Sequence, residues 1–490
     1  MKISRLTPIL LLPIFSLATI TFERTYGDPA KYETGYAVQT TFDSGYAVIG
    51  CATTGRDIIY FIKVDSVGDP FWSTLVSQGY VHKNSYSFKE LNDSGFICVG
   101  YIDSILGTAP ADVYLVRFNS FGDTLWSRLY GGDSLDRGYW VEITPDSNFV
   151  IAGQTKSYGF GSSDVWLIKT DTSGSVLWNQ TYGGTGYDMG RCVKNTPDRG
   201  FIVVGSTYSF GAGFRDIYLI KTDSLGVPSW SQAYGGSGYE WGYDVEHTAD
   251  NGYIIVGSTN SFGAWGLDIF LIKTDSLGNT LWTETYGGVN DDVGHSVVVT
   301  NDGGYVIAGY TNSYGAGRGD VWLIKVDSLG SIIWTKCYGG VKDDWAYAVE
   351  KTQDGGYVIT GFTSSMPGDT LRSDLYLIKT DSLGNAGIEE FQIDIRKKDF
   401  MVLRIHPNPF TQTTDITLPA DGWQYAMGCM KIHDITGRLC RQWDNSTIQH
   451  SHYVTWDGTD ELGNILPSGV YFLQLKVGGY TMVEQLIFVR

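Results

Sequence analysis

The sequence is poor in charged residues, in long apolar runs and in helical patterning. Charged side chains make up 18% of its 490 residues. No long stretch places apolar residues at helical spacing, and beyond the N-terminus no segment is apolar enough to span a bilayer. Glycine is abundant instead, at 62 residues, and aromatic residues reach 14%. This composition favours short strands joined by tight turns.

Positive charge is also scarce. Lysine and arginine total 35 against 53 acidic residues, which gives a formal net charge of −18. Nucleic acid is itself polyanionic, so an acidic chain without a basic stripe is not expected to bind it.

Cysteine is scarce, and the common catalytic motifs are absent. The six cysteines do not recur in register with the repeat described below, which argues against a disulfide framework or a zinc site. Cys429 and Cys440 flank a predicted hairpin, where they could either pair or remain free thiols. No metalloprotease, nucleophile-elbow or phosphate-loop motif is present.

The N-terminus reads as a signal peptide. Lys2 and Arg5 precede an apolar run over 9–14, and 16–18 fits the small-x-small cleavage rule. Cleavage after Ala18 predicts an exported protein, secreted or held at the outer cell surface, with no transmembrane segment once residues 1–18 are removed.

A repeat of about 52 residues dominates the remaining chain. The motif Leu-Ile-Lys-Thr-Asp and its variants occur seven times, and the segment Gly-Tyr-Val-Ile-x-Gly recurs seven times alongside it. The Asp position of the first motif falls at Asp65, Asn119, Asp171, Asp223, Asp275, Asp327 and Asp381. Each unit reads as four short strands with an apolar pattern on both faces. This pattern predicts an all-β fold, a seven-bladed β-propeller over 19–385.

The two ends of the repeat predict a closed ring. A Trp opens the fourth strand of the first six units, but the seventh unit has no such strand. Phe22 and Tyr26 provide the missing aromatic-x-x-x-Tyr spacing directly after the signal peptide. We therefore expect residues 21–26 to form the outer strand of blade seven and to cover two exposed sheet edges.

One turn of the repeat resembles motifs of two propeller families. Residues 273–282, Lys-Thr-Asp-Ser-Leu-Gly-Asn-Thr-Leu-Trp, resemble the Asp-box of sialidase-like propellers and the Asp…Gly…Trp repeat of quinone-dependent dehydrogenase-like propellers. Both families use the motif in turns and packing, so the resemblance implies fold and no catalytic residue.

The last residues, 403–490, resemble the C-terminal sorting domain of type IX secretion substrates. The matching stretches are His-Pro-Asn-Pro-Phe at 406–410, His-Asp-Ile-Thr-Gly-Arg at 433–438 and Pro-Ser-Gly-Val-Tyr-Phe at 467–472. Residues 456–463 also resemble the Ig-like domain of flagellar hook-capping proteins. Both imply a small Ig-like β-sandwich, joined by a linker over 386–402. The first implies type IX secretion machinery as a partner; the alternative is an accessory sandwich without an export role.

The loop entering most units carries a carboxylate at a fixed offset from Tyr-Gly-Gly, with Lys83 breaking the pattern in unit two. Six acids at one channel mouth could hold Ca²⁺, the single cofactor we consider, or a cationic ligand. Alternatively each acid accepts N–H bonds from its own turn, which the recurrence favours. The six acids are Glu33, Asp136, Asp188, Glu240, Asp292 and Asp344.

Four tryptophans fall outside the repeat register: Trp140, Trp241, Trp265 and Trp345. We expect them in or near the loops of the binding face, where exposed aromatic rings suit carbohydrate or peptide stacking.

Two further charged rings read as structural, with adjacent blades exchanging charges. The first is Asp57, Asp112, Asp164, Asp216, Asp268, Asp320 and Asp374. The second is Lys63, Arg117, Lys169, Lys221, Lys273, Lys325 and Lys379.

The leading hypothesis is a non-catalytic extracellular propeller that binds a glycan, a peptide or a surface partner. One alternative is a hydrolase or lyase that acts on extracellular polysaccharide through carboxylates on the loop face. Another is a purely structural surface protein. An enzyme is expected to break the repeat symmetry with a local cluster of acids, His or Arg.

Overall fold

The computed structural model describes residues 20–28, 30–53, 57–76, 82–103, 110–365, 372–387, 404–417, 428–434, 438–443, 453–477 and 480–490. The chain divides into two compact units, Met1–Gly387 and Ile388–Arg490. The predicted signal peptide and residues 388–402 of the predicted linker lie outside the described residues. Within the described part, no helix is long and apolar enough to cross a membrane.

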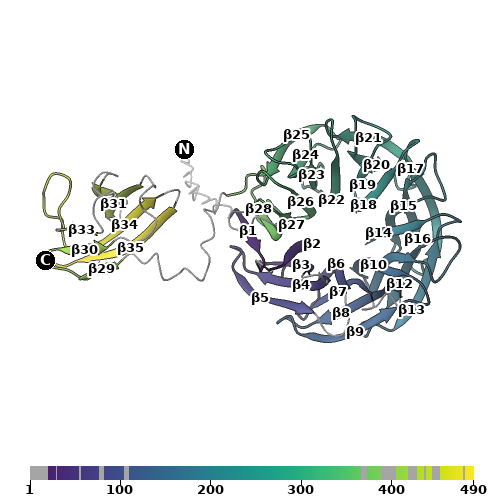
Figure 1. Ribbon diagram of the computed structural model, residues 1–490, viewed down its shortest axis with the longest axis horizontal. Helices are drawn as coiled ribbons and strands as arrows, with labels where there is room; N and C mark the ends of the chain where they lie inside the picture. The colour runs from purple at the N-terminus through teal and green to yellow at the C-terminus, as the bar shows by residue number, and fades with distance from the viewer. Residues whose placement is uncertain are drawn as a thin grey trace, which may run out of the picture. The chain divides into compact units, whose positions relative to one another are not determined.

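The first unit is a seven-bladed β-propeller, as the repeat predicts (Figure 1). Each blade is an antiparallel sheet of four strands. The inner strands are β2 (Tyr32–Thr40), β6 (His82–Glu90), β10 (Asp136–Ile143), β14 (Asp188–Asn195), β18 (Glu240–His247), β22 (Asp292–Val299) and β26 (Asp344–Lys351). The second strands are β3 (Tyr46–Thr53), β7 (Phe96–Asp103), β11 (Phe149–Thr155), β15 (Phe201–Thr207), β19 (Tyr253–Thr259), β23 (Tyr305–Thr311) and β27 (Tyr357–Thr363).

The outer half of each blade completes the sheet. The third strands are β4 (Asp57–Val64), β8 (Asp112–Phe118), β12 (Asp164–Thr170), β16 (Asp216–Thr222), β20 (Asp268–Thr274), β24 (Asp320–Val326) and β28 (Asp374–Thr380). The fourth strands are β5 (Pro70–Val76), β9 (Thr124–Tyr130), β13 (Val176–Tyr182), β17 (Pro228–Tyr234), β21 (Thr280–Tyr286), β25 (Ile332–Tyr338) and, from the start of the chain, β1 (Phe22–Tyr26).

Strand β1 closes the ring. It pairs antiparallel with β28, with Phe22 opposite Lys379 and Tyr26 opposite Leu375. The order of the blade-seven sheet is β1-β28-β27-β26. The predicted closure is confirmed, and the strand begins at Phe22, one residue later than expected.

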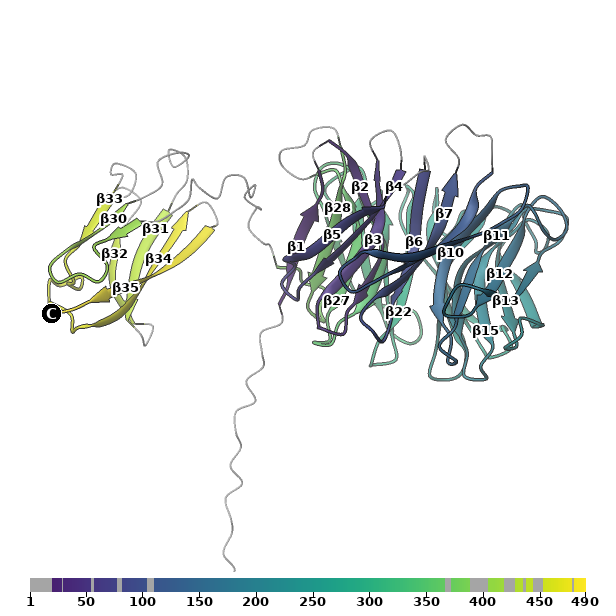
Figure 2. The same cartoon turned by 90° about the horizontal axis from the view of Figure 1, so that it is seen from below.

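Antiparallel connectivity gives the ring two different sides (Figure 2). Connections between first and second strands, and between third and fourth, lie on one side, which we call the hairpin side. Connections from second to third strand, and from one blade to the next, lie on the opposite side, which we call the loop side. Each inner strand runs from the loop side to the hairpin side.

Neighbouring blades are joined by an aromatic ring that packs on a glycine. The turn between third and fourth strands contains a glycine with positive φ, such as Gly278 at +80°. A Cβ on Gly278 would come within 2.7 Å of the Trp230 ring of the preceding blade. At the closing joint, Phe22 of β1 packs on Gly68 of blade one. These turns need glycine both for the left-handed φ and for the close approach.

A tyrosine hydroxyl completes most of these joints, and we call the pair of contacts the interblade joint. The tyrosine that ends the fourth strand donates to the carbonyl of the same glycine, as Tyr26 does to Gly68 at 2.6 Å. The other five bonds have the same length: Tyr130–Gly174, Tyr182–Gly226, Tyr234–Gly278, Tyr286–Gly330 and Tyr338–Gly384. Between blades one and two, Val76 stands in place of the tyrosine, and Trp72 donates to the Ser120 carbonyl instead.

The hydrophobic core lies between blades. One cluster, for example, joins Ile254 and Leu271 of blade five to Val297 and Ile324 of blade six, all 0% exposed. Second and third strands are buried on both faces because each sheet is sandwiched between two others. No blade buries its apolar surface alone, so the ring depends on its interblade contacts.

The ring of lysines is structural, but its partners differ from those expected. Each cation pairs with an aspartate in the hairpin of its own blade and not with an adjacent blade. Lys273, for example, lies 2.8 Å from Asp250. The other pairs are Lys63–Asp43, Arg117–Asp93, Lys169–Asp146, Lys221–Asp198, Lys325–Asp302 and Lys379–Asp354.

The second unit is a small β-sandwich. One sheet has the order β29-β30-β33 and the other β32-β31-β34-β35. Buried residues of both sheets form one core, which includes Phe410, Trp456 and Phe488. Cys440 is a buried free thiol, and the side chain of Cys429 lies outside those described. The strands are β29 (Arg404–His406), β30 (Thr414–Thr417), β31 (Gly428–Asp434), β32 (Leu439–Trp443), β33 (Tyr453–Trp456), β34 (Gly469–Val477) and β35 (Tyr480–Phe488).

Substituting the joint glycine tests the interblade joint. Gly278→Ala and Gly303→Ala introduce the same methyl at nearly the same φ, +80° and +79°, so both incur roughly 1–2 kcal/mol of left-handed strain. A Cβ meets Trp230 only at Gly278 and meets nothing within 4 Å at Gly303. We expect Gly278→Ala to lower the free energy of unfolding by about 1–3 kcal/mol more than Gly303→Ala. Equal losses in urea denaturation would contradict the joint.

Candidate functional site

Each inner strand carries a β-bulge at one bulky residue. At this residue the register between the inner strand and the second strand shifts by one. In blade three the shift lies between Gly138 and Trp140, so Tyr139 has no partner in β11. Bulges redirect side chains out of the regular alternation. The seven bulged residues, which we call the bulge ring, are Tyr36, Tyr86, Tyr139, Arg191, Tyr243, His295 and Tyr347.

The bulge ring lines the central channel with contacting side chains. Tyr36 lies 4.9 Å from Tyr86 and 5.2 Å from Tyr347, measured between ring centroids. Arg191 lies over Tyr139 at 4.4 Å. His295 lies 4.9 Å from both Tyr243 and Tyr347. Five blades contribute tyrosine, but blades four and six contribute Arg and His, so the ring breaks the repeat symmetry.

His295 is a neutral member of this ring. Its Nδ1 lies 2.8 Å from the Ala346 carbonyl. Burial lowers the pKa of His295 to about 4. The imidazole therefore adds no positive charge to the channel at neutral pH, which leaves Arg191 as the one cation among the seven residues.

On the hairpin side of the bulge ring lies a small cavity of about 110 Å³. Trp140 lines it between two lysines, with the Lys194 ammonium 4.6 Å and the Lys89 ammonium 5.8 Å from its ring. Lys194 pairs with Glu246 at 2.5 Å and Lys89 with Glu142 at 3.3 Å. Both lysines of this cavity are therefore paired within the protein, and its lining also includes Asp244 and Glu350.

Three arginines lie near the loop-side mouth of the channel, and we call them the arginine cluster: Arg137, Arg191 and Arg215. Arg137 is the second residue of β10, at the loop-side end of that strand. Its guanidinium carbon lies 4.4 Å from the ring centroid of Tyr101 in blade two. Arg215, directly before β16, lies 4.7 Å over Tyr208. Among the described residues, none of the three guanidiniums has a carboxylate within 4.0 Å, whereas most other buried cations are paired.

Tyr187 is the common neighbour of this cluster. Burial raises the pKa of Tyr187, and the guanidiniums of Arg137 and Arg191 oppose the rise. Burial lowers the pKa of Arg215, and the Arg191 charge lowers it further. The three positive charges therefore act on one region, spanning blades two to five. Tyr187 also donates to Gln154 Oε1 at 2.7 Å.

A stack of aromatic rings leads from the rim to the arginine cluster, and we call it the aromatic ladder: Phe214, Tyr239 and Trp241. Phe214 and Tyr239 are nearly parallel, 12° apart with centroids at 5.4 Å, and Tyr239 stacks on Trp241 at 5.9 Å. Phe214 is 65% exposed. Arg215 lies 5.4 Å over the Trp241 ring and connects the ladder to the cluster.

Across the ring, the same strand positions carry aromatics without charge. Trp345 stacks on Tyr310 with centroids 4.2 Å apart and planes 11° apart, and it also packs against Phe362. The buried Trp345 Nε1 has no hydrogen-bond partner among the described residues. The mouth therefore has one sector with the arginine cluster and one sector in which stacked aromatic rings lie without an arginine.

The four predicted tryptophans are thus not brought together. Trp241 and Trp345 are the second residues of the inner strands β18 and β26 and lie at the mouth, in different sectors. Trp140 lies in the hairpin-side cavity, beyond the bulge, and so is not on the expected loop face. Trp265 lies on an exposed loop of blade five and is 85% exposed.

The six predicted carboxylates are buried between blades and bind their own turns. Asp136, Asp188, Asp292 and Asp344 are 0% exposed. Asp188 accepts the Gly184 N–H at 2.8 Å and the Ser209 hydroxyl at 2.6 Å. Equivalent N–H bonds from the second glycine reach Asp136, Glu240, Asp292 and Asp344, and Glu33 accepts the Asp28 N–H. The side chain of Lys83 lies outside those described.

Each of these acids faces a second carboxylate of the preceding blade. A Cβ on Gly183 would touch both Asp164 and Asp188, at 2.3 and 2.5 Å. Burial raises the pKa of Asp164 to about 6, although the Phe160 N–H opposes it, and Asp188 adds to the rise. In the described residues no group of three or more His, Cys, Asp or Glu could hold a metal ion. The Ca²⁺ hypothesis stays a prediction.

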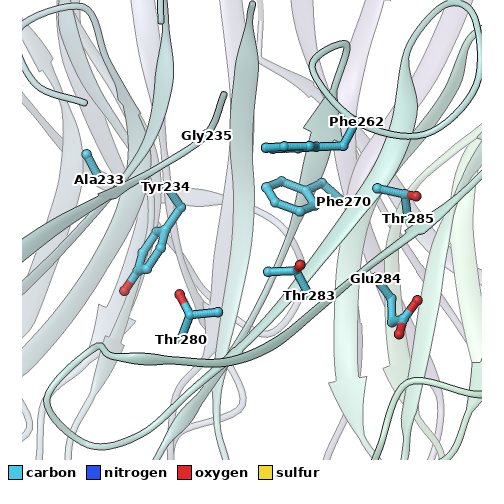
Figure 3. A pocket seen from close by; sticks show the side chains of 9 residues that line it. All are labelled: Ala233, Tyr234, Gly235, Phe262, Phe270, Thr280, Thr283, Glu284 and Thr285. Atoms are coloured by element: carbon cyan, nitrogen blue, oxygen red, sulfur yellow. The ribbon is translucent and has the colours of Figure 1, made fainter. Parts of the chain in front are cut away.

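A larger groove of about 420 Å³ lies toward the outer rim of blades four and five (Figure 3). Phe262 and Phe270 form one wall, with centroids 5.5 Å apart, and Thr283 and Glu284 of β21 lie beside them. Equivalent aromatic pairs recur in three other blades: Tyr158–Trp166, Phe210–Tyr218 and Tyr314–Trp322. This groove therefore belongs to the repeated frame.

Sequence reasoning missed the arginine cluster, although a signal was present. Arg137 and Arg191 lie one and three residues after a ring carboxylate, at positions where some other blades carry Trp and Tyr, respectively. Searching for recurrence hides such positions. Searching for variation within a constant frame would have found them.

Comparison with known proteins shows structural similarity alone. No family model and no curated protein matches the chain. Among solved structures, PorZ, an essential bacterial surface component of the type IX secretion system of Porphyromonas gingivalis, has 13% identity and a TM-score of 0.40. The match covers 93% of this chain and 59% of PorZ, so the chain spans about three fifths of that protein.

Two glycosidases are also similar. An α-L-arabinanase of Penicillium chrysogenum has 10% identity, and the α-L-arabinofuranosidase Arb93A of Fusarium graminearum has 12%. Each has a TM-score of 0.41 and covers 60% of this chain and 92% of its own.

Glu33, at the joint between blades seven and one, gives the carboxylate pairs a pH signature. Burial raises the pKa of Glu33 to about 7, and Asp374 contributes to the rise. The contribution of Glu33 to the free energy of unfolding is fully present below the unfolded pKa of 4.5, and it is lost as the pH rises through the folded pKa of about 7. The free energy of unfolding of Glu33→Gln minus that of the wild type should therefore increase from pH 5 to pH 8, as measured by urea denaturation at each pH.

Asp198→Asn is the control for this experiment. Although burial opposes it, hydrogen bonds from Lys221 and Thr196 lower the pKa of Asp198 to about 2. Asp198 stabilises the fold at any pH above its unfolded pKa. The decrease in the free energy of unfolding caused by Asp198→Asn should therefore be the same at every pH from 5 to 8. A constant difference for Glu33→Gln as well would contradict the carboxylate pairing.

Proposed function

We propose that this protein is a non-catalytic extracellular binding module whose ligand, a glycan, is held at the loop-side mouth of the propeller. The observation that carries the proposal is the break in symmetry at this mouth. In the part of the propeller that the structure describes, the frame recurs around the ring, while the arginine cluster and the aromatic ladder occur once. A unique, partly exposed set of aromatic and cationic side chains on a rigid repeated frame is typical of a binding site.

The chemistry of the mouth favours binding over hydrolysis. Hydrolysis of a glycosidic bond commonly uses a pair of carboxylates that reach the substrate. The recurring carboxylates here are buried and bonded to glycine turns. The aromatic ladder and the arginine cluster offer rings and guanidiniums, which stack and donate hydrogen bonds.

Residues 1–18 and 403–490 supply the export signals in this proposal. Residues 1–18 direct the chain across the inner membrane, 386–402 act as linker, and 403–490 act as a sorting domain for a type IX secretion system. Support comes from the three motif stretches at 406–410, 433–438 and 467–472. The propeller would then be presented on the outer cell surface or released.

A glycan array with the full chain lacking 1–18 tests the binding proposal. Because Trp241 connects the aromatic ladder to Arg215, Trp241→Ala should weaken any binding found by at least about 10-fold, or about 1.4 kcal/mol. Phe121→Ala is the control, because Phe121 is 75% exposed on a turn of the hairpin side and its loss should leave binding unchanged.

Two results would contradict the binding proposal. The first is the absence of binding to every glycan on the array. The second is release of shortened products from a bound glycan, which would establish the hydrolase or lyase alternative.

Removing 403–490 tests the export proposal. In a host with a type IX system, the truncated protein should accumulate in the periplasm, whereas the full chain reaches the cell surface, as followed by fractionation and surface proteolysis. A parallel fusion of 386–490 to a periplasmic reporter should bring that reporter to the surface. Surface delivery of the truncated protein would contradict the proposal.

A further inference from the structure

We propose that the ligand of the loop-side mouth is an acidic glycan, one that carries a carboxylate or sulfate group and binds it between Arg137, Arg191 and Arg215. This inference rests on the proposed function and adds the charge and the chemical class of the ligand. Its starting point is the concentration of unpaired positive charge in a protein whose net charge is −18.

The arginine cluster is the exception to the charge pairing of this propeller. The seven structural cations of the third strands each meet an aspartate, and Lys89 and Lys194 in the hairpin-side cavity each meet a glutamate. Arg137, Arg191 and Arg215 have no carboxylate within 4.0 Å among the described residues. Mutual repulsion of partly buried cations is unfavourable unless an anion relieves it.

The acids of the same blades do not serve as internal partners. Asp136, Asp188 and Glu240 begin the same inner strands, but all three are 0% exposed and accept N–H groups of their glycine turns. The carboxylate of Asp103 in blade two interacts electrostatically with the Arg137 guanidinium, but it lies beyond ion-pair distance. The anion that the cluster fits therefore comes from outside the chain.

The guanidiniums are held in place before any ligand arrives. Arg137 lies on Tyr101, Arg191 on Tyr139 and Arg215 on Tyr208, at 4.4, 4.4 and 4.7 Å. Stacking fixes the planes of these side chains and reduces the entropy lost on binding. The buried Nε atoms of Arg137 and Arg215 and the Nε2 of Gln154, which is 1% exposed, have no hydrogen-bond partner among the described residues. Donors without acceptors in a buried region fit an oxyanion ligand.

The aromatic ladder indicates that the anion is carried on a sugar ring. Phe214 and Tyr239 offer nearly parallel faces that lead to Trp241 and Arg215. Flat aromatic faces next to planar guanidiniums fit a ring with an acidic substituent. A peptide bound by strand addition would need a free strand edge. The bulges interrupt the inner strand edges, which makes them poor templates for strand addition.

Matched probes that differ in charge alone test the inference. The full chain lacking 1–18 is titrated calorimetrically with oligogalacturonate, with its methyl ester, with a chondroitin sulfate oligosaccharide, with its desulfated form and with hexaglutamate. We expect at least one acidic glycan to bind 10-fold or more tightly than its neutralised counterpart. The two acidic glycans distinguish a carboxylate from a sulfate. Raising NaCl to 0.5 M should weaken this binding.

Substitution of the arginines locates the site. Arg215→Gln and Arg137→Gln should each weaken the acidic probe about 10-fold or more, and Arg215→Lys should restore only part of the loss because an ammonium lacks the planar fork. Arg318→Gln is the matched control, since Arg318 lies in the corresponding exposed loop of blade six and should be neutral. Thermal unfolding of each variant verifies that the ring is intact.

The outcomes separate the two proposals. Equal binding of acidic and neutralised glycans, with dependence on Trp241, overturns the inference and leaves the proposed function standing. Tighter binding of hexaglutamate overturns the assignment to a glycan. If the affinity for the acidic glycan is unchanged in both Arg137→Gln and Arg215→Gln, the assignment of the site to the arginine cluster is wrong. Absence of binding to every glycan overturns the proposed function and this inference together.

Discussion

The packing of one aromatic ring on one glycine, repeated around the axis, is the interaction on which the propeller depends. The glycine occupies a conformation that other residues rarely adopt, and the ring fills the space where a Cβ would be. In six joints a tyrosine hydroxyl also binds the carbonyl of that glycine. Both contacts cross from one blade to the next. Because no blade buries its apolar faces alone, these joints convert seven weak sheets into one cooperative ring.

Closure uses the same joint and not a special one. Phe22 stands for the tryptophan, Tyr26 for the tyrosine, and Gly68 for the turn glycine. The first and last parts of the propeller are therefore joined by contacts equivalent to those inside the chain. Residues that build the frame can then recur with little change, which frees the inner strands to differ between blades.

The frame was predictable because its signals are local and repeated. Strand number, blade number and closure all followed from fixed spacings and from the missing tryptophan in the seventh unit. Other contacts depend on how segments fold against one another. The partner of Lys273 is the hairpin residue Asp250, 23 residues away. Neither the spacing of the repeat nor the side of the strand on which Lys273 lies indicates this partner. Trp140 and Trp345 both lie on inner strands, but the bulge at Tyr139 separates Trp140 from the loop side.

The arginine cluster was not predictable for a related reason. Arg137, Arg191 and Arg215 occupy three different positions of the repeat, and they come near one another only when blades three and four pack side by side. Tyr101 and Tyr139, the partners of Arg137 and Arg191, belong to the preceding blade, whereas Tyr208, the partner of Arg215, follows the second strand of the same blade. The predicted carboxylates illustrate the converse: the most regular acidic positions of the sequence lie in buried turns, while the irregular positions lie at the mouth.

Amide hydrogen exchange along β28 tests the closed ring most directly. In a closed ring, β28 is an interior strand with β27 on one side and β1 on the other. Its amides should therefore be protected as strongly as those of β24, the equivalent strand of blade six, which lies between β23 and β25. Rapid exchange of those β28 amides that face β1, with β24 still protected, would show an open edge and contradict closure.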